Sequence, residues 1–369
     1  MNILIEFEKK PLLFTRPVAT VCCTSPSLLA DSLKEAERFL RAGYYVAGFF
    51  SYEAGYCFEE RLYDGKEYGF PLLLMGAYRK PAFRRFSPER EDTAEVRDIS
   101  LNITRPAYAR NIERIRSYIN AGEVYQITYC IKLAFTLRGS ARALYSTLLY
   151  NQPVPYPAYI ETEQFKILSL SPERFFKKEG NKVITEPMKG TWPRGQSLFS
   201  DILARIRFSS DNKNKAENVM IADLLRNDIG KIGNAVRAPK LFTVTGYRTL
   251  YQMTSTVTGT VPRGISLCDL FAAIFPSGSV TGAPKIRAME IIKDLEAEER
   301  KIYTGAIGYI SPDRDMYFNI PIRTLLISGQ SGEMGIGGGI VWDSTAQGEW
   351  AEGLLKARFL TDSAAGAVR

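Results

Sequence analysis

The sequence predicts an α+β protein, and three segments of the 369-residue chain carry this prediction. Residues 124–135 alternate between apolar and polar side chains, which is typical of a strand with one buried face. Residues 104–120 and 284–298 carry apolar side chains at helical spacing, with a proline near the start of each. A long strand and amphipathic helices in one chain indicate a sheet covered by helices.

The N-terminal hundred residues add elements of both kinds. We expect a strand at 3–7, a helix at 32–42 that ends at Gly43, and a buried strand at 44–51. Residues 79–100 are charged and contain two prolines, so they are expected to be a connecting segment.

The remaining predicted elements lie in the C-terminal two thirds. A strand at 182–185 precedes Pro187-Met188-Lys189-Gly190-Thr191, where proline and glycine predict a turn. We expect a helix at 216–227 and a C-terminal helix from about 345 to 359.

Composition is that of a globular protein, with 45% apolar and 24% charged residues. Residues 1–10 lack the apolar core of a signal peptide, and the longest apolar stretch, near 72–75, is too short to span a bilayer. The five cysteines match no metal-binding spacing, so we interpret them as thiols of a cytoplasmic protein.

The chain contains no histidine, which excludes histidine-based triads, histidine metal sites and imidazole acid–base catalysis. The net charge is +8, but the basic residues are scattered and no nucleic-acid-binding motif is present. We therefore expect no nucleic-acid partner and no membrane partner, and a mild attraction for anionic substrates.

Several separated blocks of sequence are more informative than any single residue. They are Gly122-Glu123-Val124-Tyr125-Gln126, Ser171-Pro172-Glu173-Arg174-Phe175, Pro187-Met188-Lys189-Gly190-Thr191, residues 216–228 (AENVMIADLLRND), residues 276–285 (PSGSVTGAPK) and Gly337-Gly338-Gly339-Ile340-Val341-Trp342-Asp343-Ser344 running to Glu352. In this order they resemble the chorismate-utilising enzymes, and within that family they are most similar to component I of the aminodeoxychorismate synthases. The resemblance covers about residues 100–360, and 50–56 (FSYEAGY) also resembles this subfamily.

The resemblance implies a specific fold. Two large, mainly antiparallel sheets would pack as a sandwich with helices on the outside. Residues 1–100 would form an N-terminal region that is structurally integrated with the rest, and 101–369 would form the chorismate-binding catalytic region.

The resemblance also implies a magnesium site. Glu217 and Glu352 occupy the positions of metal-binding glutamates, and Glu349 lies one helical turn before Glu352 on the same face. Carboxylates, substrate oxygens and water are the ligands that Mg²⁺ prefers. Asn214 stands where relatives often have an acidic residue. Taken alone, these glutamates would be interpreted as exposed helix residues.

Substrate-binding residues follow from the same resemblance. Chorismate has two carboxylates, and arginine binds a carboxylate through two parallel hydrogen bonds. Glycine backbone and helix N-termini also bind anions. The residues expected to bind substrate are Arg323, Tyr303, Ser279, Gly338, Gly339, Gln126, Thr191 and Gln252. The alternative for the glycines is a set of tight turns, because they lack the context of a dinucleotide-binding motif.

The catalytic residues implied are Lys189 and Glu173. A lysine becomes a nucleophile when desolvation or a nearby cation lowers its pKa, although a lone lysine in a turn is ordinarily solvated. In aminodeoxychorismate synthases this lysine attacks C2 and expels the C4 hydroxyl, after which ammonia adds at C4 and releases the lysine. Glu173 would be the general acid.

Gln126 and Gln252 narrow the prediction further. Family members that add water to chorismate have a lysine at the position of Gln126. Anthranilate synthases have a histidine at the position of Gln252 and a small residue at the position of Lys189. We therefore predict formation of 4-amino-4-deoxychorismate, toward 4-aminobenzoate and folate. The alternatives are anthranilate synthase component I, or an inactive anion-binding regulatory protein on the same fold.

The predicted source of nitrogen is outside the chain. No region resembles a glutamine amidotransferase, and the cysteine–histidine pair of such enzymes is impossible without histidine. Ammonia is expected from a separate glutamine amidotransferase subunit, component II, or from solution.

Overall fold

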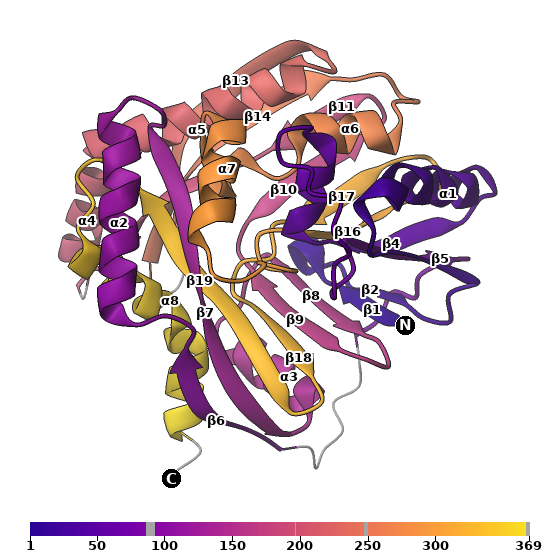
Figure 1. Cartoon of the computed structure of the whole chain (residues 1–369), viewed down its shortest axis with the longest axis horizontal. Coiled ribbons are helices and arrows are strands. Elements are labelled where there is room, and N and C mark those ends of the chain that lie inside the picture. Colours follow the sequence, from indigo (N-terminus) through magenta and orange to yellow (C-terminus); the bar gives the residue numbers. More distant parts are fainter. Residues whose placement is uncertain (86–92, 196, 247–249, 367–369) are drawn as a thin grey trace.

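The computed structural model describes residues 1–85, 93–195, 197–246 and 250–366 (Figure 1). The side chains of Thr191, Leu250 and 363–366 lie outside the described part. Two large sheets form the body of the protein, and the strand pairings in the described residues are antiparallel. The predicted pair of large antiparallel sheets is therefore confirmed.

The first sheet has nine strands in the described residues, in the order β15-β7-β19-β18-β9-β8-β1-β2, with β6 paired to β7. Its longest pair is formed by β7 and β19, near one end of this order, and crosses the front of Figure 1. The strands are β1 (Asn2–Ile5), β2 (Leu12–Phe14), β6 (Ala94–Leu101), β7 (Gln126–Gly139), β8 (Tyr156–Glu161), β9 (Lys166–Ser171), β15 (Gly282–Ala283), β18 (Thr324–Ser328) and β19 (Ser331–Ile340).

The second sheet has ten strands in the described residues, in the order β12-β14-β11-β10-β17-β16-β4-β5-β3, with β13 paired to β14. The strands are β3 (Ala19–Cys23), β4 (Tyr45–Phe50), β5 (Leu73–Tyr78), β10 (Arg174–Glu179), β11 (Lys182–Thr185), β12 (Met188–Pro193), β13 (Asn234–Gly246), β14 (Leu250–Thr260), β16 (Ala306–Ile310) and β17 (Met316–Asn319).

Helices cover the outer faces of the two sheets. The α-helices are α1 (Leu29–Arg41), α2 (Arg105–Asn120), α3 (Ala141–Asn151), α4 (Leu198–Ser210), α5 (Asn212–Gly230), α6 (Leu267–Ile274), α7 (Lys285–Leu295) and α8 (Ala346–Gly366), and the 3-10 helices are η1 (Phe7–Lys9), η2 (Pro26–Leu28), η3 (Tyr52–Phe58) and η4 (Gly278–Val280). None of the helices in the described residues has the length and apolar character needed to cross a membrane.

Three apolar clusters explain the layering. The cluster between the sheets contains side chains of both, including Ile3 and Phe14 of the first and Phe49 and Ile307 of the second. A second cluster joins the first sheet to α2, α3, α7 and α8, and a third joins the second sheet to α1, α5 and α6. The sandwich with outer helices predicted above is therefore correct.

The N-terminal residues contribute strands to both sheets. Strand β1 pairs with β8, with Ile3 opposite Ile160, and β4 pairs with β16, with Gly48 opposite Gly308. Strands that are distant in the sequence thus lie side by side.

Most predicted elements are present, with ends shifted by a few residues. Two predictions were wrong. Part of the expected connecting segment, residues 94–101, is the edge strand β6. The Pro187–Thr191 block does not form a turn, because residues from Met188 onward are strand β12.

Candidate active site

Lys189 lies at a β-bulge near the start of β12. Met188 pairs with Thr254 of β14 and Thr191 pairs with Gln252, so β12 has one residue more than β14 across this interval. Gly190 makes the bulge possible because its φ is +86°. A Cβ at Gly190 would also lie 2.5 Å from the Asn214 side-chain oxygen on α5. The bulge therefore holds Lys189 close against α5.

The Lys189 ammonium faces the Gly339 backbone and the amide of Gln126. A Cβ added to Gly339 would lie 3.4 Å from Lys189 Nζ and 2.3 Å from Gln126 Nε2. Gln126 is 1% exposed, and within the described residues neither polar atom of its side chain has a hydrogen-bond partner. Because a buried amide without partners is costly, this arrangement is suited to a polar ligand.

Burial lowers the pKa of Lys189, and the nearby carboxylates of Glu173 and Glu217 oppose this effect. The side chain is half-buried as a whole, while the surroundings of its ammonium group are strongly desolvating. Desolvation favours the neutral amine, which is the nucleophilic form.

Glu173 connects the end of β9 to β10 and is 5% exposed. Its Oε1 atom accepts a hydrogen bond of 2.8 Å from Ser279 Oγ and a longer one of 3.5 Å from the Met188 backbone N–H. Burial raises the pKa of Glu173 to about 7, against the opposing effects of Ser279 and Lys189. A carboxyl group with this pKa can donate a proton near neutral pH.

Ser279 belongs to η4, in the segment between α6 and α7. Its hydroxyl lies 3.2 Å from that of Ser277 and donates to Glu173. We predicted a direct role in holding a substrate carboxylate. In the structure this hydroxyl bonds to the candidate acid Glu173, and its role in binding a substrate carboxylate stays a prediction.

Gly338 and helix α8 form the acidic side of the site. A Cβ on Gly338 would lie 3.3 Å from Glu349 Oε2 and from Lys356 Nζ, and 3.5 Å from Glu352 Oε1. Glu349 accepts a hydrogen bond of 2.6 Å from Ser344, and Lys356 bonds to Glu352 at 2.7 Å. A side chain at residue 338 would fill this space.

Glu217 of α5 lies close enough to Lys189 and Glu352 to interact with both electrostatically. Burial raises its pKa, and Lys189 and Lys213 lower it while Glu352 raises it. Burial likewise raises the pKa of Glu349. In Glu352 the pairing with Lys356 and other lysines outweighs burial, so its pKa is lowered.

These carboxylates suit a hard metal ion that is also bound by substrate. Within the described ranges, no three acidic or cysteine side chains meet closely enough to hold a metal alone. Mg²⁺ commonly binds through one or two carboxylates together with substrate oxygens and water, so the residues present fit such an ion. The raised pKa values of Glu217 and Glu349 indicate that a cation would be favourable here.

Arg323 lies immediately before β18, and Tyr303 lies shortly before β16. The two side chains have different surroundings. Arg323 has a left-handed backbone (φ +50°), burial lowers its pKa, and no carboxylate pairs with it in the part of the chain that is described. Tyr303 is buried, and its ring lies against Gly335, where an added Cβ would be 2.2 Å from the ring. A desolvated guanidinium without an acidic partner is a binding group for an anion.

Gln252 of β14 is 3% exposed, and its side-chain oxygen has no hydrogen-bond partner within the described residues. Thr191 pairs with it through the backbone, but the Thr191 side chain lies outside the described part. The orphaned oxygen of Gln252 is, like Gln126, suited to a polar ligand.

Two residues of this region were missed by sequence reasoning. Thr128 of β7 is 7% exposed and its hydroxyl has no described partner, and Lys356 bonds to Glu352 and to the Gly337 carbonyl at 2.8 Å. Thr128 follows Gln126 by two positions on the same strand face, and Lys356 follows Glu352 by one helical turn. These spacings could have identified both.

Comparison with known proteins identifies the family to which the chain belongs. Residues 83–362 match the family of chorismate binding enzymes. Aminodeoxychorismate synthase component 1 of Escherichia coli is 39% identical over 272 residues, which are 73% of this chain and 60% of that protein. Anthranilate synthase component 1 of Methanothermobacter thermautotrophicus is 33% identical over 330 residues, 83% of this chain and 71% of that protein.

Among solved structures, anthranilate synthase component I from Streptococcus pneumoniae superposes with a TM-score of 0.82 at 25% identity, covering 97% of this chain and 92% of that one. The chain spans less than two thirds of the length of the aminodeoxychorismate synthase relatives it matches first.

Proposed function

Because the chain belongs to the chorismate binding enzymes, we propose that it is the chorismate-aminating component of an aminodeoxychorismate synthase. It would convert chorismate and ammonia to 4-amino-4-deoxychorismate and water. The observation that carries this proposal is the position of the half-buried Lys189, whose desolvated amino group lies beside Gln126 and Gly339 in a site that also contains Glu173.

Burial drives Lys189 and Glu173 toward the forms that the reaction needs. It lowers the pKa of the lysine, which favours a neutral amine, and raises that of the glutamate to about 7, which favours a protonated carboxyl. The attraction between charged Lys189 and charged Glu173 opposes both pKa shifts. Neutral lysine with protonated glutamate is therefore one of several ionisation states of the pair near neutral pH.

The proposed reaction has two displacements. Lys189 Nζ bonds to C2 of chorismate, the ring double bonds shift, and the C4 hydroxyl leaves as water with the proton of Glu173. Ammonia then bonds to C4, the double bonds shift back and the C2–Nζ bond breaks. One proton from the nitrogen centres restores Glu173, and the lysine is regenerated. Two easier steps replace one hard displacement.

Arg323 and the acidic cluster would orient the two carboxylates of chorismate. Arg323 has no acidic partner in the described structure and would bind one of them. Glu217, Glu349 and Glu352 would hold a Mg²⁺ ion, which when bound would neutralise the ring carboxylate and fix its position. Lys356 would keep Glu352 ionised.

The proposed partner is a glutamine amidotransferase subunit. Relatives named component 1 support the existence of a second component. The absence of histidine in the chain supports an external source of ammonia. We propose a cytoplasmic location, consistent with free cysteine thiols.

Anthranilate formation is the second candidate, because an anthranilate synthase relative is similar over 83% of the chain. Mass spectrometry of the product from chorismate, ammonium and Mg²⁺ separates the two, since aminodeoxychorismate retains the enolpyruvyl group and anthranilate does not. An anthranilate product would overturn the proposal. Absence of turnover would favour the third alternative, an anion-binding regulatory protein.

A further inference from the structure

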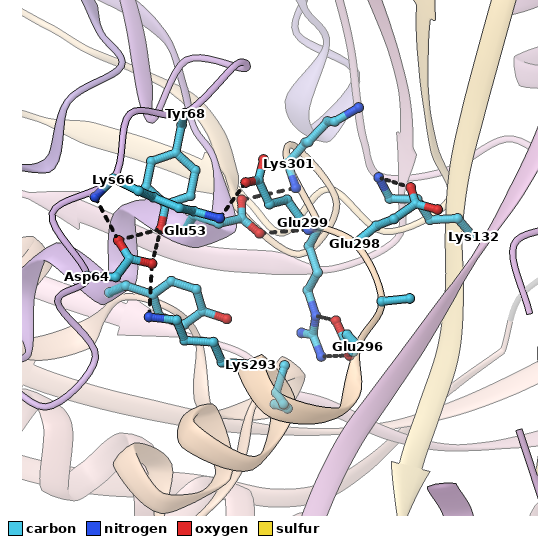
Figure 2. A pocket seen from close by; sticks show the side chains of 14 residues that line it. Glu53, Asp64, Lys66, Tyr68, Lys132, Lys293, Glu296, Glu298, Glu299 and Lys301 are labelled. Atoms are coloured by element: carbon cyan, nitrogen blue, oxygen red, sulfur yellow. Dashed lines mark hydrogen bonds and ion pairs between the residues drawn. The ribbon is translucent and has the colours of Figure 1, made fainter. Parts of the chain in front are cut away.

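The FSYEAGY segment at 50–56 resembles the aminodeoxychorismate synthases, yet none of its residues reaches the Lys189 site in the contacts described above. In the structure it runs from the end of β4 into η3, and Glu53 within η3 is 3% exposed. The Glu53 carboxylate accepts hydrogen bonds from the backbone N–H groups of Arg300 at 2.6 Å and Lys301 at 3.0 Å (Figure 2). Lys301 has a left-handed backbone with φ +55°, so Glu53 stabilises an otherwise unfavourable turn.

Arg300 uses all of its N–H donors inside the protein. Nε donates a hydrogen bond of 2.8 Å to Glu296, and Nη2 donates one of 2.7 Å to the same carboxylate. The remaining donors bond to the Val280 carbonyl at 2.9 Å, Thr304 Oγ1 at 3.2 Å and the Thr128 carbonyl at 2.6 Å. These contacts account for all five N–H groups of a guanidinium, so Arg300 is not available to bind substrate. Its face also stacks on Tyr52 at 4.3 Å.

Two of these acceptors lie next to residues of the candidate active site. Val280 follows Ser279, whose hydroxyl bonds to Glu173, and Thr128 lies two positions beyond Gln126 on β7. A Cβ on Gly55 would lie 2.4 Å from the Pro276 ring, so the FSYEAGY segment also touches the start of the Ser279 segment. The buried contacts of Arg300 and Gly55 therefore support the segments that carry Ser279, the partner of Glu173, and Gln126.

A cavity of about 410 Å³ is lined by Glu53 and Arg300 among others and shares no lining residue with the Lys189 site (Figure 2). Its charged side chains pair with one another, as in Lys66–Glu299 at 2.8 Å and Lys293–Asp64 at 3.0 Å. The charged residues of these two pairs line the same cavity as Glu53 but have no described contact with residues 276–284. They therefore serve as matched controls for substitutions at Glu53 and Arg300.

We propose that Glu53 and Arg300 are positioning residues, which hold Ser279 in hydrogen-bonding contact with Glu173 and thereby set the ionisation of the catalytic acid. Glu53 acts through the backbone of Arg300, and Arg300 acts through the Val280 carbonyl. The charged and titratable groups that face this relay are Lys189 beside Glu173, Glu299 and Arg300 beside Glu53, and Glu296, Cys130 and Tyr52 beside Arg300.

The test measures the titration of Glu173 directly. The protein is labelled with [δ-13C]glutamate, and the Glu173 resonance is identified by its loss in Glu173→Gln. Ser279→Ala should raise the Glu173 pKa, because the hydrogen bond from Ser279 stabilises the charged form. Arg300→Lys should raise it in the same direction, since lysine cannot reproduce the planar set of donors.

A double-mutant cycle separates this relay from a general structural role. Ser279→Ala combined with Arg300→Lys should raise the pKa no further than Ser279→Ala alone, because Arg300 acts through Ser279. Glu53→Gln, which can accept fewer backbone hydrogen bonds in the required geometry, should shift the pKa in the same direction and serves if Arg300→Lys does not fold. Lys66→Gln is the matched control and should leave the titration unchanged.

A lower unfolding temperature in Arg300→Lys and Glu53→Gln with an unchanged Glu173 titration would overturn the proposal, as would additive shifts in the double variant. The catalytic consequence rests on the proposed function: although more of Glu173 would be protonated in Arg300→Lys, kcat for chorismate should fall about tenfold with a smaller change in KM, because a displaced Ser279 no longer orients the acid. The titration needs no turnover, so an inactive wild-type protein would count against the proposed function alone.

Discussion

Ser279 donates a 2.8 Å hydrogen bond to the Glu173 carboxylate, joining the segment before α7 to the start of β10. This bond favours the ionised form of Glu173, whereas burial favours the protonated form and raises the pKa to about 7. The acid is thus held between its two protonation states near neutral pH. Lys189 experiences the opposite combination, because burial lowers its pKa while the carboxylate of Glu173 raises it.

Lys189→Ala should severely lower the formation of aminodeoxychorismate, because the variant lacks the amine that attacks C2. The smaller side chain could admit ammonia to C2 and leave some anthranilate. Both products are measured by mass spectrometry after incubation with chorismate, ammonium and Mg²⁺. Undiminished aminodeoxychorismate turnover would exclude the covalent mechanism.

Glu173→Gln should lower kcat about 100- to 10,000-fold, which is the usual contribution of a positioned general acid. Glutamine preserves the size of the side chain and can accept the hydrogen bond from Ser279, but it cannot donate a proton to the leaving hydroxyl. The matched control is Glu298→Gln, because the Glu298 carboxylate pairs with Lys132 and has no described contact with the candidate active site. Equal activity of both variants would show that Glu173 is not the acid.

Chelation of divalent cations with EDTA should abolish turnover, and Mg²⁺ should restore it. Glu352→Gln and Glu217→Gln should each weaken the dependence on Mg²⁺ or abolish activity, because carboxylates are the hard ligands available here. Mg²⁺ binding measured by calorimetry in the presence of chorismate provides a readout without turnover. Full activity in EDTA would contradict both metal assignments.

The isolated chain should use ammonium salts but not glutamine. Glutamine hydrolysis requires an activated cysteine, usually paired with histidine, and the chain has no histidine. The rate at fixed total ammonium should rise with pH over the range in which free NH₃ increases. Adding the glutaminase subunit should confer glutamine use and give a complex on gel filtration. Robust turnover of glutamine by a chain shown to be pure would contradict this prediction.

Stability should fall as pH rises from about 4.5 to about 7. Burial raises the pKa of Glu53 from 4.5 to about 7, so over this range the folded protein binds a proton that the unfolded chain has lost. Each such group lowers the free energy of unfolding by up to about 1.4 kcal/mol per pH unit. Glu53→Gln should reduce this slope, as measured by urea unfolding at several pH values. An unchanged slope would show that Glu53 is ionised throughout.

The fold was predictable because its longest elements have strong patterns. The sequence of strand β7 alternates between apolar side chains and polar or small ones, although residues 126–133 are buried on both faces. Helix α2 is capped by Thr104, whose hydroxyl accepts a hydrogen bond from the Ala107 N–H. Strand β6 was missed because it lies at a sheet edge and buries only Val96 fully, so its pattern is weak. Lys189 was assigned to a turn because proline and glycine break strands, whereas here Gly190 forms a bulge within one.

The arrangement of the site depended on resemblance, and local patterns could not supply it. Glu217 and Glu352 are ordinary helix carboxylates until the fold brings α5 and α8 to the same region. Lys356 resembles an exposed partner of Glu352 at helical spacing. Arg300 binds carbonyls of residues 128 and 280, and no local spacing reveals such partners.

The pairing of early with late strands has a consequence for biosynthesis. Strand β4 cannot pair with β16 until about residue 310 has left the ribosome, and β1 cannot pair with β8 until β8 has been synthesised. Such non-local pairing slows folding and leaves apolar strand edges exposed on the growing chain. Helix α8, which carries Glu349, Glu352 and Lys356, is synthesised after every strand described here. The nascent chain can therefore acquire its complete acidic cluster only after every strand of both sheets has been synthesised, so a product truncated before α8 would have the strands but not the cluster.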